Sequence, residues 1–161
     1  AYVDVGGGST EISLLHDGVL AESHSFNIGT LRMLGGAVSE QELMNMRQML
    51  EEYAREFPAT KIIGSGGNIN RLFRLARLKG PQRELPVERL QELYDTLQAL
   101  TVVQRMEQFK LKEDRADVIV PAAEIFLTVA EALGSKSIIV PNISLADSIT
   151  DGIWREVQIK D

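Results

Sequence analysis

Three consecutive glycines between two short segments of strand-like sequence constrain the fold of this chain more than any other feature. Residues 1–5 form a mostly apolar run that ends at Gly6, Gly7 and Gly8, and residues 9–15 then alternate between polar and apolar side chains. A period of two is typical of a half-buried β-strand. Because glycine has no Cβ atom, the backbone amides of such a turn can face a ligand closely. The start of the chain is therefore predicted to be a strand, a glycine turn and a second strand.

The segments that follow predict a mixed α/β domain. Asp17-Gly18 is typical of a type I′ hairpin turn, so residues 19–26 are predicted to form a third strand. Ser39 and Glu42 have the spacing of a capping box at the start of a helix. The other predicted elements are strands at residues 61–64 and 137–140 and helices at residues 39–57, 69–78, 87–110 with a break near Thr101, 121–133 opened by Pro121, and 146–157. This order predicts one α/β domain with a mixed five-stranded sheet flanked by helices.

The composition excludes several classes of protein and of site. The chain of 161 residues carries a net charge of −6 and contains no cysteine, which excludes disulfides, thiolate metal ligands and cysteine nucleophiles. A general nucleic-acid binder needs a basic face, so we expect no nucleic-acid partner. No apolar run is long enough to span a bilayer, so we expect no membrane partner. We also expect a cytoplasmic location, with which the absence of cysteine is compatible.

The first glycine run lies between two carboxylates that could hold a metal. The three glycine amides can converge on phosphate oxygens, and Ser9 adds a hydroxyl group. Asp4 precedes the turn and is placed to hold Mg²⁺ or another divalent cation, which accepts a few hard oxygen ligands beside a phosphate. Glu11 shares a strand face with Ser9, so it is a candidate second metal contact or orienter of the attacking water. The alternative is a glycine hairpin with a solvated Asp4 and Glu11.

A second glycine-rich segment lies between the predicted strand at residues 61–64 and the helix that follows it. Free amides at a helix N-terminus carry partial positive charge and favour an anion. The candidate phosphate-binding residues here are Ser65, Gly66, Gly67 and Asn68. The alternative is an ordinary strand-to-helix turn in which Asn68 is the N-cap. Two such loops after separate strands are what a two-sided phosphate clamp requires.

Several cations follow the second glycine segment along the next predicted helix. They are Arg71, Arg74, Arg77 and Lys79. We expect them to form a solvated helix face. The alternative is that they contact a polyphosphate chain, because positive charge near a cleft attracts a polyanion.

Residues 4–11, Asp-Val-Gly-Gly-Gly-Ser-Thr-Glu, resemble the D-[IV]-G-G-G-S-x-E signature of the Ppx/GppA phosphatase family. The resemblance continues in residues 64–69, 115–122 and 144–154, in the expected order and over nearly the whole chain. Two segments depart from the family pattern. Many members have a Ser-Gly-Thr sequence where this chain has Gly66-Gly67-Asn68, and many have a sequence similar to L-R-E-G where residues 145–152 differ.

The resemblance implies the ribonuclease-H-like fold of actin, hsp70 and the sugar kinases, and hydrolysis of a terminal phosphoanhydride bond with Mg²⁺. The implied substrate is inorganic polyphosphate or guanosine pentaphosphate. Asp4 and Glu11 would then bind the metal and organise the water. The cleaved phosphate would be held on one side by Gly6, Gly7, Gly8 and Ser9, and on the other by Ser65, Gly66, Gly67 and Asn68.

The resemblance also implies that residues 1–161 are a single actin-like domain, a fragment of a longer chain. In the family a preceding actin-like half supplies a glutamate, the expected general base. We therefore expect that half as a partner within the same chain, little or no activity of the fragment alone, and a homodimer of the full-length protein. Two other functions stay open, which are a (p)ppGpp- or nucleotide-sensing module without turnover and an ATP-dependent kinase of the same superfold.

Overall fold

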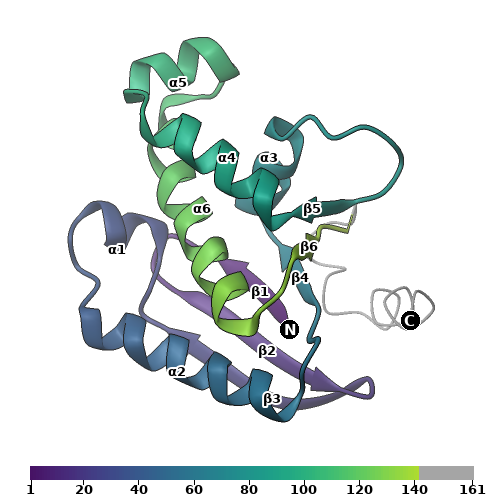
Figure 1. Ribbon diagram of the computed structural model, residues 1–161. Helices are drawn as coiled ribbons and strands as arrows, with labels where there is room; N and C mark the ends of the chain where they lie inside the picture. Colours follow the sequence, from purple (N-terminus) through teal and green to yellow (C-terminus); the bar gives the residue numbers. More distant parts are fainter. Residues whose placement is uncertain (142–161) are drawn as a thin grey trace.

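The computed structural model describes residues 1–141, which are built around one six-stranded sheet (Figure 1). The strands are β1 (Tyr2–Val5), β2 (Thr10–His16), β3 (Val19–Phe26), β4 (Ile62–Ser65), β5 (Glu84–Pro86) and β6 (Ser137–Ile139), in the spatial order β3-β2-β1-β4-β6-β5. β1 pairs with β2 antiparallel and with β4 parallel. The expected mixed sheet is confirmed, and it has one strand more than the five expected.

The additional strand is β5, in a stretch that the sequence predicted as a loop because of its prolines and Gly80. β5 pairs antiparallel with β6, and the buried Leu85 lies opposite the buried Ile138. β5 is at the edge of the sheet. Proline has no backbone N–H to donate, so Pro86 is tolerated in an edge strand. Burial of a single leucine and an edge position therefore outweigh the turn signals.

Within residues 1–141, six helices follow or separate the strands. They are α1 (Thr30–Leu34), α2 (Glu40–Glu56), α3 (Gly67–Leu75), α4 (Val87–Gln98), α5 (Val102–Phe109) and α6 (Glu113–Leu133). The Ser39 side chain accepts a hydrogen bond from the Glu42 N–H at the start of α2, as predicted. The predicted break at Thr101 is also confirmed, because Thr101 caps α5 in a capping box with Gln104. None of the helices within residues 1–141 is long and apolar enough to cross a membrane.

Two helix predictions were wrong, and one cannot be compared. The short helix α1 was not predicted, and α6 begins at Glu113, so Pro121 lies inside the helix. Proline removes one helical hydrogen bond at a cost of about 3 kcal/mol. α6 tolerates it because the helix is anchored by packing, since Pro121 itself and the neighbouring Ala122 and Ala123 are buried. The predicted helix at residues 146–157 lies outside the described residues.

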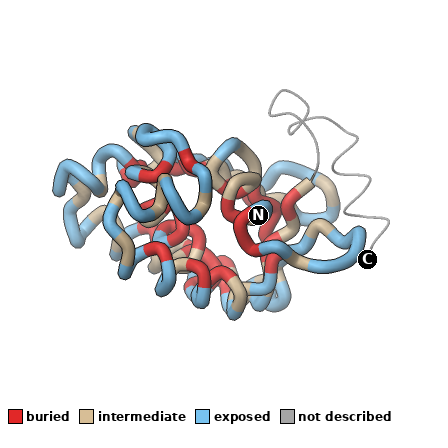
Figure 2. Tube along the Cα trace, turned by 90° about the horizontal axis from the view of Figure 1, so that it is seen from above, coloured by how far each residue is buried: buried red, intermediate tan, exposed pale blue. Residues whose placement is uncertain are grey.

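The core lies between one face of the sheet and the helices. Val3 and Val5 of β1 and Ile12 and Leu14 of β2 belong to one buried cluster with residues of α2, α3, α4 and α6. Figure 2 shows buried positions through the interior of the described residues and exposed positions on the outer turns. Because side chains alternate along a strand, Asp4 lies on the opposite face from Val3 and Val5.

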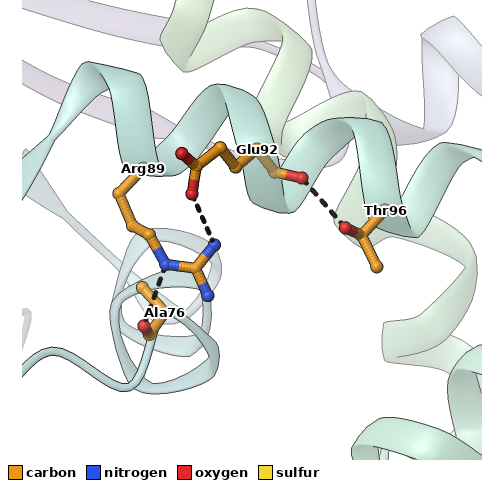
Figure 3. A network of polar contacts seen from close by, with 4 residues as sticks. All are labelled: Ala76, Arg89, Glu92 and Thr96. Carbon is orange, nitrogen blue, oxygen red and sulfur yellow. Dashed lines mark hydrogen bonds and ion pairs between the residues drawn. The ribbon is translucent and has the colours of Figure 1, made fainter.

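A polar contact joins the end of α3 to α4 (Figure 3). Arg89 of α4 donates from Nε to the Ala76 carbonyl at the C-cap of α3 (3.2 Å) and from Nη1 to Glu92 Oε2 (3.3 Å). Thr96 Oγ1 donates to the Glu92 carbonyl (3.0 Å). The C-terminal end of α3 is therefore held by α4, while its N-terminal end carries the second glycine segment.

Candidate functional site

The carboxyl ends of the parallel strands β1 and β4 bring the two glycine segments together. β1 runs into residues 6–9, the first glycine loop, and β4 runs into residues 65–68, the second glycine loop. Asp4 pairs with Ser65 across the two strands. The Asn68 side chain also donates from Nδ2 to the Val5 carbonyl (3.0 Å). The two loops that the sequence analysis singled out are thus neighbours in space.

The carbonyl groups of the first glycine loop are directed to α1. Backbone N–H groups at the start of α1 donate to Gly6 O (2.9 Å) and Gly7 O (3.0 Å), and Arg32 Nε donates to Gly8 O (2.6 Å). Within residues 1–141, no backbone carbonyl accepts from the N–H of Gly7 or Gly8. The loop therefore has its carbonyls paired and these two amides available to an anion, as a phosphate-binding turn needs.

Gly29, which the sequence analysis did not single out, allows this arrangement. A Cβ atom on Gly29 would lie 2.3 Å from Gly7 O and 2.6 Å from the carbonyl carbon of Gly8. Thr10 Oγ1 donates to the Ile28 carbonyl (2.6 Å) and holds the same segment against β2. The only signal in the sequence is a glycine just before a short apolar segment, which is too common to indicate a contact with a distant loop.

The two candidate carboxylates are cross-strand neighbours. Asp4 on β1 lies opposite Glu11 on β2, so both are on the face away from the core. Glu11 Oε1 accepts from Ser9 Oγ (2.8 Å) and Ser25 Oγ (2.9 Å). Ser9, expected to donate to a phosphate, donates to Glu11 here. The expected common face for Ser9 and Glu11 is therefore observed as a direct contact.

Asp4 is half-buried, and its electrostatic surroundings favour a cation. Burial first, and the negative charge of Glu11 second, raise the pKa of Asp4 above its usual range. A divalent cation between the two carboxylates would offset both effects. Within the described residues, no group of three or more His, Cys, Asp or Glu side chains could hold a metal. Two carboxylates still fit Mg²⁺, because Mg²⁺ keeps several waters and also binds substrate phosphates.

The second glycine loop depends on one glycine with a positive φ. Gly66 has φ 100° and ψ 173° and is the N-cap of α3. Its Cβ atom would lie 2.8 Å from Asp4 Oδ1, so the absence of a side chain lets the loop approach that carboxylate. The N-cap interpretation of Asn68 is wrong. Asn68 lies inside α3, and its side chain joins the helix to the end of β1.

Two asparagine–arginine pairs support the second glycine loop, and neither was predicted. Asn70 Nδ2 donates to Gly66 O (2.7 Å), while Asn70 Oδ1 accepts from Arg83 Nη2 (3.1 Å). Arg83 also donates to the Val140 carbonyl (2.7 Å) and lies over the Phe73 ring, 4.5 Å from its centre. In the other pair, Asn68 Oδ1 accepts a long bond from the Arg71 guanidinium. The arginines have only donors, so each fixes the orientation of its asparagine amide.

Several solved structures share this architecture. The Ppx/GppA family member of Aquifex aeolicus is 25% identical, with a TM-score of 0.70 over 99% of this chain and 56% of that chain. An exopolyphosphatase from Cytophaga hutchinsonii is 21% identical, with a TM-score of 0.72 over 96% of this chain and 56% of that chain. An exopolyphosphatase-like protein is 24% identical, with a TM-score of 0.68 over 97% of this chain and 59% of that chain. No curated protein sequence matches the chain.

The chain thus spans little more than half the length of these solved relatives, 56% in the first of them. The expected actin-like, ribonuclease-H-like fold is confirmed by the likeness to these structures. The resemblance first indicated by residues 4–11 is confirmed over a much longer stretch, because residues 1–154 match the Ppx/GppA phosphatase family. Together with the paired glycine loops, this match shows that the chain belongs to the Ppx/GppA phosphatase family.

Proposed function

We propose that this chain carries the phosphate- and metal-binding part of a Mg²⁺-dependent hydrolase that releases terminal phosphate from inorganic polyphosphate or guanosine pentaphosphate. One observation carries the proposal. The Asp4 carboxylate lies between the two glycine loops, opposite Glu11 on one side and beside Ser65 and Gly66 on the other. Membership of a phosphatase family supports the reaction class.

Phosphoryl transfer depends mainly on positioning and charge neutralisation. In this proposal different residues bind the cation and the phosphate. Asp4 and Glu11 would hold the cation, which neutralises negative charge on the transferred phosphoryl group. The Gly7 and Gly8 amides would bind the oxygens of that group, because their own loop leaves them without carbonyl partners. The second glycine loop would bind the phosphate from the other side.

The group that activates the water is proposed to come from a preceding actin-like domain. No third carboxylate or histidine joins Asp4 and Glu11 in a cluster among residues 1–141. The solved relatives also extend well beyond the part that this chain matches. On this proposal, residues 1–161 alone bind phosphate weakly and release little product.

The experiment measures phosphate release with and without Mg²⁺, from long-chain polyphosphate and from guanosine pentaphosphate, by the protein at its natural length. Asp4→Asn removes the charge but keeps the shape, and we expect kcat/KM to fall about 10²- to 10³-fold. The matched control is Asp17→Asn at the tip of the hairpin, where the side chain is 88% exposed. Asn tolerates the positive φ of Asp17, so this variant should keep its activity.

The comparison of substrates decides between the two proposed polyanions. Mg²⁺-dependent release from one of them that is lost in Asp4→Asn alone would support the hydrolase and name its substrate. A folded natural-length protein that releases phosphate from neither would contradict the proposal. Saturable nucleotide binding without release would then favour the sensing function.

A further inference from the structure

One partly buried cationic group beside the second glycine loop takes no part in the proposed chemistry. Arg71 is in the middle of α3, and its Nη2 lies 3.4 Å from the position that a Cβ atom of Gly67 would occupy. Its Nη1 makes a long bond to Asn68 Oδ1 (3.5 Å). Its Nε is buried and has no hydrogen-bond partner among the described residues. Arg71 thus differs from the exposed Arg74 and Arg77 on the same segment, and the expected solvated face does not include it.

The charges around Arg71 are mostly of its own sign. Burial first, and then the positive charges of Arg115 and Arg74, lower the pKa of the Arg71 guanidinium, with Asp114 acting in the opposite direction. This excess of positive charge occurs in a chain whose net charge is −6. A bound anion would relieve the repulsion, and the proposed function places a polyanion beside the second glycine loop.

The unused edge of the guanidinium has the right geometry for a phosphate. In arginine, the Nε–H and one N–H of Nη2 point the same way and can donate to two oxygens of one phosphate. Nη1 is the nitrogen that contacts Asn68, so among residues 1–141 the Nε–Nη2 edge is the one without a hydrogen-bond partner. A buried N–H without an acceptor is unfavourable, so turning this edge toward an arriving anion is favoured.

We propose that Arg71 binds a second phosphate of a ligand with linked phosphates, next to the phosphate held between the two glycine loops. The placement of that first phosphate rests on the proposed function. Orthophosphate has one phosphate and occupies only the position between the loops. A condensed phosphate such as tripolyphosphate reaches Arg71 as well. The second glycine loop and Arg71 therefore select for chain length in the polyanion.

The test is calorimetric titration of the natural-length protein with tripolyphosphate and with orthophosphate, in EDTA so that no hydrolysis occurs. We expect Arg71→Gln to weaken tripolyphosphate binding about tenfold and orthophosphate binding less than about twofold. Arg71→Lys keeps the charge and loses the two-donor edge, so it should restore only part of the affinity. The matched control is Arg77→Gln, which removes the same charge from an exposed position in the same part of the chain.

Four outcomes bear on the proposal. Equal weakening by Arg71→Gln and Arg77→Gln would overturn it, because the effect would then be one of net charge. Equal weakening of tripolyphosphate and orthophosphate would also overturn it. A third titration uses guanosine pentaphosphate. If Arg71→Gln weakens the binding of both tripolyphosphate and guanosine pentaphosphate, the result supports a site for linked phosphates. If it weakens only the binding of guanosine pentaphosphate, the result overturns that assignment.

The titrations separate this proposal from the proposed function. Arg71-dependent binding in a protein that shows no Mg²⁺-dependent release would support the Arg71 site and contradict the hydrolase. Mg²⁺-dependent hydrolysis in a protein whose tripolyphosphate binding is unchanged by Arg71→Gln would support the hydrolase and contradict the Arg71 site. Thermal unfolding of both Arg71 variants identifies any loss of fold, and Arg71→Lys keeps the test decisive if Arg71→Gln is unstable.

Discussion

The two glycine loops look alike in sequence and share Asp4 as a neighbour, yet the other charged side chains beside them differ. The first is flanked by Asp4 and Glu11, whose negative charges lie side by side on neighbouring strands. The second lies at the start of α3 next to Arg71, whose charged neighbours include Arg115. Glycines permit the close approach of a ligand in both loops. The side chains beside them add carboxylates that suit a cation next to the first loop, and a guanidinium that suits an anion next to the second.

The loops also differ in what holds their shape. The first is fixed by backbone hydrogen bonds to α1 and by the packing of Gly29 against it. The second is fixed by side chains, with Asn70 on the Gly66 carbonyl and Arg83 behind Asn70. A glycine-to-alanine substitution should therefore lower stability by crowding the backbone in the first loop, and by straining the backbone dihedral angles in the second.

The largest effect on stability is expected from Gly29→Ala. The new methyl group would lie 2.3 Å from the Gly7 carbonyl oxygen, and backbone on both sides leaves little room to move. We expect the free energy of unfolding to fall by about 3 kcal/mol or more. Urea unfolding followed by circular dichroism measures it. A loss below about 1 kcal/mol would show that the first loop yields easily and is not fixed by its backbone contacts.

A smaller loss is expected from Gly66→Ala in the second loop, with Gly67→Ala as its matched control. At Gly66 the φ of 100° with ψ 173° is a conformation almost restricted to glycine, so alanine should cost about 1–3 kcal/mol. At Gly67 the added methyl group meets only the tip of Arg71, and alanine favours the helix. Gly67→Ala should thus be neutral or slightly stabilising in the same urea experiment. Equal effects of the two variants would contradict the assigned role of Gly66.

The smallest effect is a difference in the pH dependence of stability, which tests the negative charge of the first loop. Because the pKa of Asp4 is raised, the folded state keeps this proton at a pH where the unfolded state has lost it. The unfolding free energy of the protein therefore falls as pH rises from the usual aspartate range through the raised pKa. Asp4→Asn lacks this contribution and should gain relative stability over that window in metal-free buffer. The window to measure runs from about pH 3 to about pH 7, where a perturbed carboxyl group titrates. A difference in unfolding free energy between the two proteins that stays constant over this window would contradict the prediction.

The parts of the site that the sequence revealed are those whose chemistry is local. Residues 4–11 contain the glycines and both carboxylates, and strand alternation alone places Glu11 on the face of Ser9. Arg83 and Gly29 act on loops far away in the sequence, and nothing in their own neighbourhood indicates a partner. The same is true of α6, whose continuation through Pro121 depends on burial among distant elements.

The bond from Asn68 to the Val5 carbonyl has a mechanical consequence. It joins the first turn of α3 to the end of β1, and β1 is already joined to β4 by their parallel ladder. The two loops therefore have no flexible connection between them and are expected to move as one rigid unit. Spreading the loops apart to admit or release a ligand would break this hydrogen bond and disturb the ladder. The ligand is therefore expected to enter and leave on the side that the two loops do not cover, where another part of the protein can close over it.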